Sequence, residues 1–504
     1  MKKLLLGNEA VARGLYEAGV TFISSYPGTP STEITECAAT YDEMYAEWAP
    51  NEKVALEAAL GASVAGARSF AAMKHVGLNV AADPLFTAAY TGVNGGLVVC
   101  VADDPAMHSS QNEQDSRHYA RAAKLPMLEP SDSGECRDFT RLAYEISEAF
   151  DTPVLLRTCT RVAHAQSLVE LKAREERPLR EYKKDPAKYV MNPGYGFRRH
   201  GVVEARLKAL AEYSESSPLN FEEMGDAAVG FVCTGSVYEY VKEAFPNASV
   251  FKVGMSFPMP IEKLRAFAAK VERLYVVEEL DGVMETELRA AGIRVDGGKD
   301  RFGCIGELSQ KKIEAAMGEK APETETFDEP VPPRPPVMCA GCPHRGVFFT
   351  LNKLKLTVLG DIGCYTLGAS EPLSAIDTTV CMGASVSMLH GFLKTRPENA
   401  GKTVAVIGDS TFLHSGVTGL INIAYNRSVS TVLILDNSIT GMTGHQQNPA
   451  TGLTLKLEAV PPVSLEKLCE AVGIRRVRVV DPGDLKALET ALREETAADE
   501  PSVI

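Results

Sequence analysis

The chain of 504 residues carries a formal net charge of −14, and 45% of its residues are hydrophobic but only 7% aromatic. This length suits about three domains, and the negative charge argues against a surface for nucleic acid or an anionic membrane. No apolar run reaches the roughly 18 residues of a membrane helix, and the N-terminal leucine run stops too early for a signal peptide. We therefore expect a cytoplasmic α/β enzyme, whose 11 cysteines form no disulfide framework.

Residues 1–165 alternate short apolar runs with helical stretches. The expected strands are Leu4–Leu6, Thr21–Ser24, Ser69–Met73, Leu97–Val101, Met127–Leu128 and Val154–Arg157. Strands that alternate with helices in this way predict a parallel sheet with helices on both faces. We interpret this segment as a first domain of the doubly wound parallel-sheet type.

Three further segments separate this domain from the last one. Residues 166–222 are highly charged and contain prolines, which favours a surface crossover over a domain. Residues 223–315 predict a second α/β domain. Its expected strands are Val229–Cys233, Ser249–Val253 and Leu274–Val277. Residues 316–336 are acidic and proline-dense, and this composition is typical of an interdomain linker.

Residues 337–504 predict a third α/β domain that contains the most informative motif of the chain. The apolar strand Val404–Ile407 runs into Gly408-Asp409-Ser410, and the next apolar strand, Thr431–Leu435, is followed by Asn437. Adjacent parallel strands end at the same edge of a sheet, where such sheets bind ligands. Asp409 and Asn437 offer hard oxygens and Gly408 permits close backbone approach, which suits a Mg²⁺ that also holds a diphosphate.

The alternative for this motif is an ordinary βαβ unit whose strands end in polar residues. The strand–helix–strand context favours the ligand site. The domain ends on Pro501–Ile504, which reads as the start of an apolar strand. Because a domain rarely stops inside a strand, we expect the chain to be cut short there.

A second candidate is Glu52, which opens a helix dense in alanine and glycine. The helix dipole favours a carboxylate at such a position without any function. Against this simple explanation, Glu52 lies nine residues before Gly61 in the same helix. The small residues also let helices approach closely, as at a subunit interface.

Together these motifs resemble thiamine diphosphate enzymes, in which a glutamate helix binds the pyrimidine and a Gly-Asp-Ser…Asn motif binds the diphosphate. The loop 26–32, Tyr-Pro-Gly-Thr-Pro-Ser-Thr, resembles that of 2-oxoacid:ferredoxin oxidoreductases. Met73–Asn79, Ala102–Pro105 and Met442–Gln446 resemble the α subunits of indolepyruvate ferredoxin oxidoreductases in particular. The similarity covers all 504 residues. It implies a pyrimidine-binding domain at 1–165, a transketolase C-terminal-like domain at 223–315 and a diphosphate-binding domain at 337–504.

The resemblance implies oxidative decarboxylation of arylpyruvates such as indolepyruvate to the aryl-acetyl coenzyme A. Glu52 would act on the pyrimidine nitrogen of thiamine diphosphate, which carries the hard chemistry. Asp409, Asn437 and the carbonyl of Ile439 would bind Mg²⁺. The expected cofactor-binding residues are Gly408, Asp409, Ser410, Asn437, Ile439 and Thr443.

The electron path has its own candidates, Cys339, Cys342 and Cys364. Iron–sulfur clusters usually need four thiolates, and the resemblance implies that these three hold a 4Fe–4S cluster whose fourth cysteine follows Ile504, ahead of a ferredoxin-like segment. A zinc site and unligated structural thiols are the alternatives.

The substrate site is less well marked. Thr29 resembles the threonine that contacts the substrate carboxyl in the wider family, although Pro27-Gly28 and Pro30 are turn-forming residues in their own right. Relatives that act on pyruvate place an arginine near the carboxylate, where this chain has the acidic Asp103-Asp104. Arg117, His108 and His445 are the remaining candidates for the carboxylate partner, and a surface or hydrogen-bonded role is the alternative for each.

The implied partners are a smaller β subunit, ferredoxin and a second copy of the chain in an α2β2 assembly, with coenzyme A as cosubstrate. A non-redox thiamine diphosphate decarboxylase of the acetolactate synthase type is the rival enzyme. A non-catalytic subunit that retains the fold is the third hypothesis.

Overall fold

The structure, a computed structural model, describes residues 1–319, 329–332 and 334–504. The chain forms two compact units, Met1–Thr324 and Glu325–Ile504. Residues 320–328 and 333 of the predicted linker 316–336 lie outside the described residues. The predicted domain boundaries remain a prediction, but the α/β fold class is confirmed by the parallel sheets and their helices.

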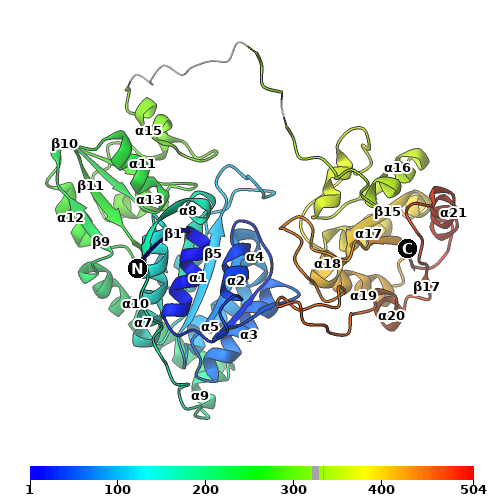
Figure 1. Cartoon of the computed structure of the whole chain (residues 1–504), viewed down its shortest axis with the longest axis horizontal. Helices are drawn as coiled ribbons and strands as arrows, with labels where there is room; N and C mark the ends of the chain where they lie inside the picture. The colour runs from blue at the N-terminus through cyan, green and yellow to red at the C-terminus, as the bar shows by residue number, and fades with distance from the viewer. Residues whose placement is uncertain (320–328, 333) are drawn as a thin grey trace. The chain divides into compact units, whose positions relative to one another are not determined.

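The first unit, blue to green in Figure 1, is built on a seven-stranded sheet in the order β12-β6-β7-β5-β4-β2-β3. Its strands are β2 Phe22–Ser25, β3 Tyr45–Trp48, β4 Ser69–Lys74, β5 Leu97–Asp103, β6 Met127–Leu128, β7 Val154–Cys159 and β12 Met255–Phe257. All pairs are parallel except β12 with β6. The carboxyl ends of the six parallel strands therefore share one edge, where Glu52, Thr29 and Lys74 lie.

Helices cover both faces of this sheet. The first group is α1 Gly7–Glu17, α2 Thr32–Ala38 and α7 Ser133–Phe150, and the second is α3 Glu52–Val64, α4 His75–Val80, α5 Ala82–Thr91 and α6 Arg117–Ala123. Ala71, Met73, Val99 and Val101 belong to the core under the second group, while their neighbours along each strand face the other way. A strand buried on both faces is a continuous apolar run, which is why β4 and β5 were evident in the sequence.

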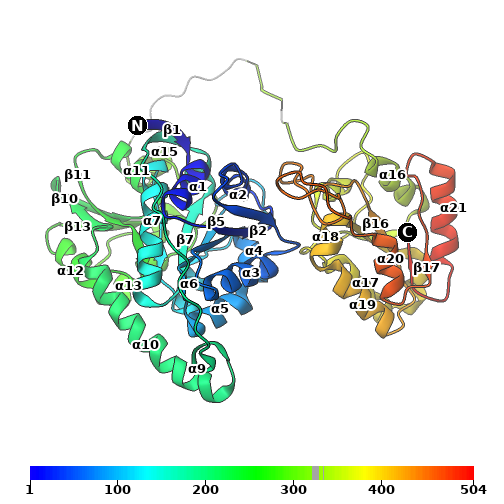
Figure 2. The same ribbon diagram turned by 60° about the horizontal axis from the view of Figure 1, so that its bottom comes forward.

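Two elements depart from the sequence prediction. Leu4–Leu6 belongs to β1 Lys2–Leu6, which pairs antiparallel with β8 Gln166–Glu170 in a ribbon separate from the parallel sheet. The charged crossover contains the short α9 Pro186–Tyr189 and the 24-residue α10 Pro193–Ser216, which packs on α5 and α12 (Figure 2). Its residues 171–181 are bound to the main body through backbone bonds such as Arg180 N–H to Gly66 O, 3.0 Å.

A four-stranded sheet in the order β13-β10-β11-β9 completes the first unit. Its elements are β9 Asn220–Glu223, β10 Asp226–Cys233, β11 Ala248–Val253, β13 Arg273–Val277, α11 Ser236–Ala244, α12 Ile261–Ala268, α13 Val283–Ala290, α14 Lys299–Phe302 and α15 Gln310–Ala316. The short helix α8 Thr160–His164 packs instead on α1, β5 and β7. The three strands expected in 223–315 all lie in it. Only the edge strand β9 is antiparallel.

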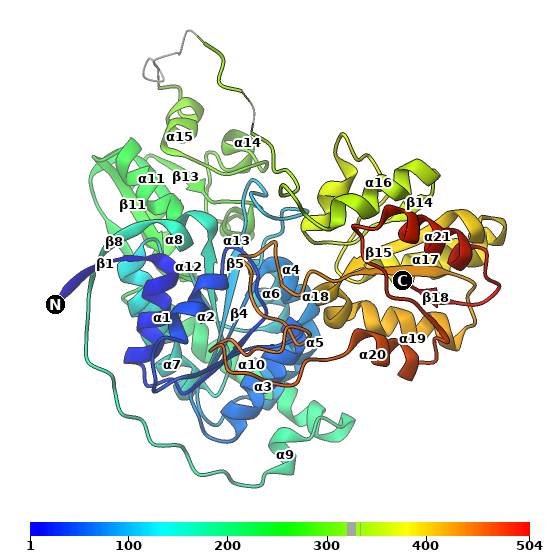
Figure 3. The same cartoon turned by 45° about the vertical axis from the view of Figure 1, so that its right-hand side comes forward.

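The second unit contains a five-stranded parallel sheet in the order β14-β15-β16-β18-β17 (Figure 3). Its elements are α16 His344–Leu354, β14 Thr357–Leu359, η1 Cys364–Ala369, α17 Ala384–Thr395, η2 Pro397–Lys402, β15 Thr403–Gly408, α18 Asp409–Thr411, η3 Phe412–Gly416, α19 Val417–Tyr425, β16 Thr431–Leu435, α20 Leu465–Ala471, β17 Arg476–Val477, α21 Leu485–Thr496 and β18 Ser502–Val503. Helices α17, α19 and α20 pack on one face, and α16 and α21 on the other.

Candidate functional site

The carboxyl ends of β15 and β16 bring together the first group of predicted ligands. These strands pair in parallel, with Gly408 opposite Leu435, so Asp409 and Asn437 follow neighbouring strand ends. Asp409 begins α18, and a π-helical segment, Phe412–Gly416, follows directly. Single turns of π-helix occur frequently at functional sites. The placement inferred from the spacing of these two residues is therefore present.

The Asn437 side chain points one end of its amide at two oxygens. That end lies 3.1 Å from Asp409 Oδ1 and 2.9 Å from the Ile439 carbonyl oxygen. If it is the nitrogen, it donates to both oxygens. If it is the oxygen, it lies about 3 Å from each of two other hard oxygens, which is the edge length of an octahedron with Mg–O distances near 2.1 Å. These three residues therefore fit a Mg²⁺ ion.

Asp409 is almost completely buried, and desolvation raises its pKa to about 6, with a further contribution from the charge of Asp436. Its second oxygen, Oδ2, accepts a hydrogen bond from Asn448 Nδ2 at 3.0 Å, which opposes that rise. A divalent cation would favour the charged carboxylate in the same place. The sequence did not indicate Asn448, because it lies in an irregular loop without a spacing rule.

Gly408 has a different neighbour from the one the sequence suggested. A Cβ atom on Gly408 would lie 2.5 Å from the Tyr365 ring, so this glycine makes room for Tyr365. The Tyr365 hydroxyl donates to Ile362 O at 2.8 Å. Nearby, the Thr440 hydroxyl donates to Ser410 Oγ at 2.9 Å, and the Thr443 hydroxyl to Gln446 Oε1 at 2.6 Å. Ser410 and Thr443 are thus tied into the loop after β16.

Asp361 is a buried carboxylate that sequence reasoning missed. It accepts hydrogen bonds from the backbone N–H groups of Gly383 at 2.8 Å and Ser385 at 2.9 Å. Asp361 therefore connects the segment before Cys364 to the start of α17. The only sequence signal was its place just after the short strand β14.

The three predicted cluster cysteines lie in the same unit. Cys339 is exposed, and Cys342 and Cys364 are partly buried. Burial raises the pKa of the Cys364 thiol, and charges on Cys342 and Cys339 would raise it further. Within the described residues, no three His, Cys, Asp or Glu side chains converge closely enough to hold a metal ion. The cluster remains a prediction.

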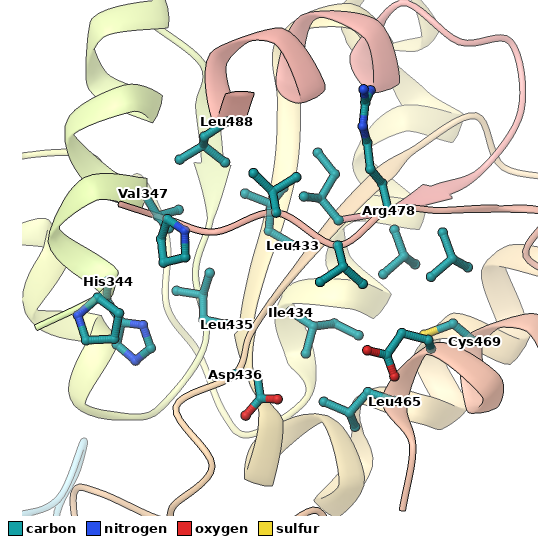
Figure 4. Close-up of a pocket in the computed structure, with 18 residues that line it drawn as sticks. His344, Val347, Leu433, Ile434, Leu435, Asp436, Leu465, Cys469, Arg478 and Leu488 are labelled. Carbon is teal, nitrogen blue, oxygen red and sulfur yellow. The ribbon is translucent and has the colours of Figure 1, made fainter. Parts of the chain in front are cut away.

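A pocket in the second unit lies beside β16 and β18. It has a volume of about 280 Å³ and mostly aliphatic walls, including Leu433, Leu435 and Leu488 (Figure 4). Asp436, Glu466 and Arg478 are its charged residues. None of the proposed Mg²⁺ ligands Asp409, Asn437 and Ile439 lines it, so it is separate from the predicted diphosphate site.

In the first unit, Glu52 opens α3 as predicted. Asn51 caps the helix by accepting the Val54 N–H at 2.9 Å, and the Glu52 side chain is only 3% exposed. The carboxylate packs against Gly77, where an added Cβ atom would lie 2.5 Å from Glu52 Oε1. Gly77 belongs to the Met73–Asn79 motif, so that motif makes room for the glutamate.

Thr29 lies in the loop between β2 and α2, and its carbonyl oxygen accepts a hydrogen bond from the Ser109 hydroxyl at 3.2 Å. Ser109 belongs to the loop that follows β5. This loop is held by Asp104, which accepts the Ser109 N–H and the Ser110 hydroxyl, both at 2.8 Å. The acidic segment that replaced the expected arginine is therefore a support for the loop.

Arg117, predicted as a substrate residue, lies in a buried ion-pair cluster. It is buried at the start of α6, where it pairs with Asp115 and Glu278, both at 2.5 Å. It also donates to the Glu279 and Asp281 carbonyl oxygens. Its guanidinium therefore joins the two sheets of the first unit, which favours a structural role. His108 pairs with Glu307 at 3.3 Å, and His445 is exposed.

Two known families match parts of this chain. Residues 13–214 match the thiamine diphosphate-binding domain of pyruvate flavodoxin/ferredoxin oxidoreductases. Residues 361–504 match the C-terminal TPP binding domain of thiamine pyrophosphate enzymes.

Two relatives match almost the whole chain. Indolepyruvate oxidoreductase subunit IorA of Archaeoglobus fulgidus is 40% identical across 100% of this chain and 85% of its own length. The IorA subunit of Pyrococcus abyssi is 41% identical across 99% and 84%. The chain belongs to this family. It is thus an α subunit of the indolepyruvate oxidoreductase type, and the predicted family is confirmed.

A solved structure supports the fold. A 2-oxoglutarate:ferredoxin oxidoreductase from Magnetococcus marinus superimposes with a TM-score of 0.53 at 18% identity, covering 63% of this chain and 65% of that chain. In the part of the chain that is described, no helix is both long and apolar enough to cross a membrane.

Proposed function

We propose that this IorA-family subunit binds thiamine diphosphate and Mg²⁺ and oxidatively decarboxylates arylpyruvates, with indolepyruvate as the representative substrate. The observation that carries the proposal is the convergence of Asp409 Oδ1, the Asn437 amide and the Ile439 carbonyl. Ferredoxin would accept the electrons and coenzyme A the acyl group. A β subunit and a second copy of the chain would complete an α2β2 assembly.

When bound, thiamine diphosphate supplies the carbanion chemistry that decarboxylation of a 2-oxo acid requires. Asp409, Asn437 and Ile439 would hold the Mg²⁺ that anchors the diphosphate, and Gly408, Ser410 and Thr443 belong to the same cofactor site. Glu52 would accept a hydrogen bond at the pyrimidine nitrogen. Its burial beside Gly77 excludes water from the carboxylate and keeps it in one position.

Two further roles complete the proposal. Thr29 would contact the substrate carboxyl. Cys339, Cys342 and Cys364 would supply three thiolates to a 4Fe–4S cluster, with the fourth ligand from another segment. All three cysteines are free and lie in the second unit, which supports this assignment.

The test is reduction of ferredoxin or a viologen by the purified complex with indolepyruvate and coenzyme A. Glu52→Gln should lower the rate by at least about 100-fold, because loss of one acid–base group costs about 10²–10⁴. Glu57→Gln is the matched control on the same helix, since Glu57 is exposed and pairs with Lys53. Decarboxylation without acceptor reduction would indicate the non-redox enzyme, and full activity of Glu52→Gln would contradict the catalytic assignment.

A further inference from the structure

Lys74 is a cation that Ser109 connects to Thr29. It ends β4 at the carboxyl edge of the seven-stranded sheet. Its Nζ donates to the Ser109 carbonyl oxygen at 2.9 Å, and the Ser109 hydroxyl donates to the Thr29 carbonyl oxygen at 3.2 Å. A Cβ atom on Gly28 would lie 3.2 Å from Lys74 Cγ, so the lysine stem runs along the Thr29 loop.

The charges around Lys74 leave its ammonium without an ion pair. Asp104 and Glu52 act on it electrostatically, but no carboxylate of the described residues lies within 4.0 Å of Nζ. Asp104 instead accepts hydrogen bonds from Ser109 N–H, the Ser110 hydroxyl and the Thr160 hydroxyl. An ammonium has three donors, and the hydrogen bond found for this one goes to a neutral carbonyl.

Burial makes the charged form of Lys74 energetically unfavourable. Burial lowers the pKa of Lys74, and the charges of Asp104 and Glu52 oppose this only in part. Lys74 is half-buried, and charged groups that lose part of their water are normally paired. An anion that enters this cluster would therefore gain an ion pair. It would also need one, because the negative charges of Glu52 and Asp104 are close by.

We propose that Lys74 binds the carboxylate of the 2-oxo acid substrate beside Thr29. This inference rests on the proposed function and assigns the carboxylate partner that sequence analysis left open. Arg117, the earlier candidate, already donates to Asp115, Glu278 and two backbone carbonyls. The competing explanation is a structural role, in which Lys74 merely holds the loop after β5 through the Ser109 carbonyl.

The experiment compares Lys74→Met and Lys74→Arg in the complete, cofactor-loaded complex. Lys124→Met is the matched control, because Lys124 lies in the same unit and pairs with Glu204. Indole-3-propionate and its neutral amide serve as non-reacting ligands, and their dissociation constants are measured by isothermal titration calorimetry. KM and kcat for indolepyruvate are measured in parallel.

Lys74→Met should weaken binding of the propionate by about 10- to 150-fold, which corresponds to loss of one hydrogen bond to a charged group. Binding of the amide should change by less than about threefold, and KM should rise more than kcat falls. Lys74→Arg should restore most of the propionate affinity, since it retains the charge. Lys124→Met should resemble wild type.

Equal weakening of the propionate and the amide would overturn the proposal in favour of a structural role. Unchanged propionate binding in Lys74→Met would overturn it as well. If Lys74→Met does not fold, judged by its thermal midpoint, Lys74→Gln replaces it in the same comparison. The two proposals fail separately, because an inactive wild type would refute the proposed function while the binding comparison still decides the role of Lys74.

Discussion

The candidate site of the first unit and that of the second differ in how the chain assembles them. In the second unit, Asp409 and Asn437 follow two neighbouring strands of one sheet, so chain order alone places them together. In the first unit, Glu52 comes from a helix, Lys74 from a strand end, and Thr29 and Ser109 from two loops. The first arrangement depends on strand pairing, and the second on how helices and loops pack over an edge. A short motif can therefore reveal the first but not the second.

The largest expected effect tests the candidate site of the second unit, where Asp409 and Asn437 follow neighbouring strands. Asp409→Asn removes the carboxylate that faces Asn437 and Ile439. We expect thiamine diphosphate binding in the presence of Mg²⁺ to weaken by about 100-fold or more, because an ionised ligand to the cation is lost. Titration with the cofactor, followed by fluorescence quenching, measures this. Asp481→Asn, at a solvent-exposed turn of the same unit, is the control. Cofactor affinity that is independent of both Mg²⁺ and Asp409 would refute the site.

A smaller effect tests the candidate site of the first unit, which depends on the packing of Glu52. In Gly77→Ala, the new Cβ atom would lie 2.5 Å from Glu52 Oε1, so the carboxylate must move. Because a displacement of about 1 Å can cost about 100-fold in rate, we expect kcat to fall by about 10- to 100-fold. Gly61→Ala, which has no atom within 4 Å of the added Cβ, is the matched substitution on α3. Equal activity of the two variants would show that the position of Glu52 is not critical.

The smallest expected effect concerns Glu279, which lies where the two sheets of the first unit meet. Burial raises the pKa of Glu279 to about 7, from 4.5. The folded state therefore binds a proton that the unfolded state releases, and stability falls as the pH rises from 4.5 to 7. This group alone contributes at most roughly 3 kcal/mol to that fall.

The variant Glu279→Gln cannot ionise, so its stability should depend less on pH. The measurement is the thermal midpoint of wild type and variant between pH 5 and 8. This range includes the raised pKa of Glu279. We expect the thermal midpoint of the variant to rise relative to that of wild type as the pH rises. Glu170→Gln, which alters an exposed carboxylate, should follow wild type. A constant difference between Glu279→Gln and wild type at all pH values would contradict the assignment.

Much of the fold was predictable because its strands are continuous apolar runs. The expected strands at 97–101 and 431–435 lie in β5 and β16 for this reason. The ribbon of β1 with β8 was not predictable, because a short strand does not specify its partner. Helix α10 was missed because the crossover is highly charged. The side chains and backbone of the crossover nevertheless bind the rest of the first unit through hydrogen bonds, such as that from Arg206 Nη1 to Ala89 O at 2.7 Å.

The candidate site divides in the same way. The amino-acid sequence by itself determined the family, the αβ alternation and the pairing of Asp409 with Asn437, because periodicity and strand order are local properties of the chain. Only the tertiary structure decided that Gly77 accommodates Glu52, that Asn448 contacts Asp409, that Arg117 is engaged in an internal ion-pair network, and that Lys74 lies beside Thr29. These are contacts between segments distant in the chain, and packing selects them after the sheets have formed.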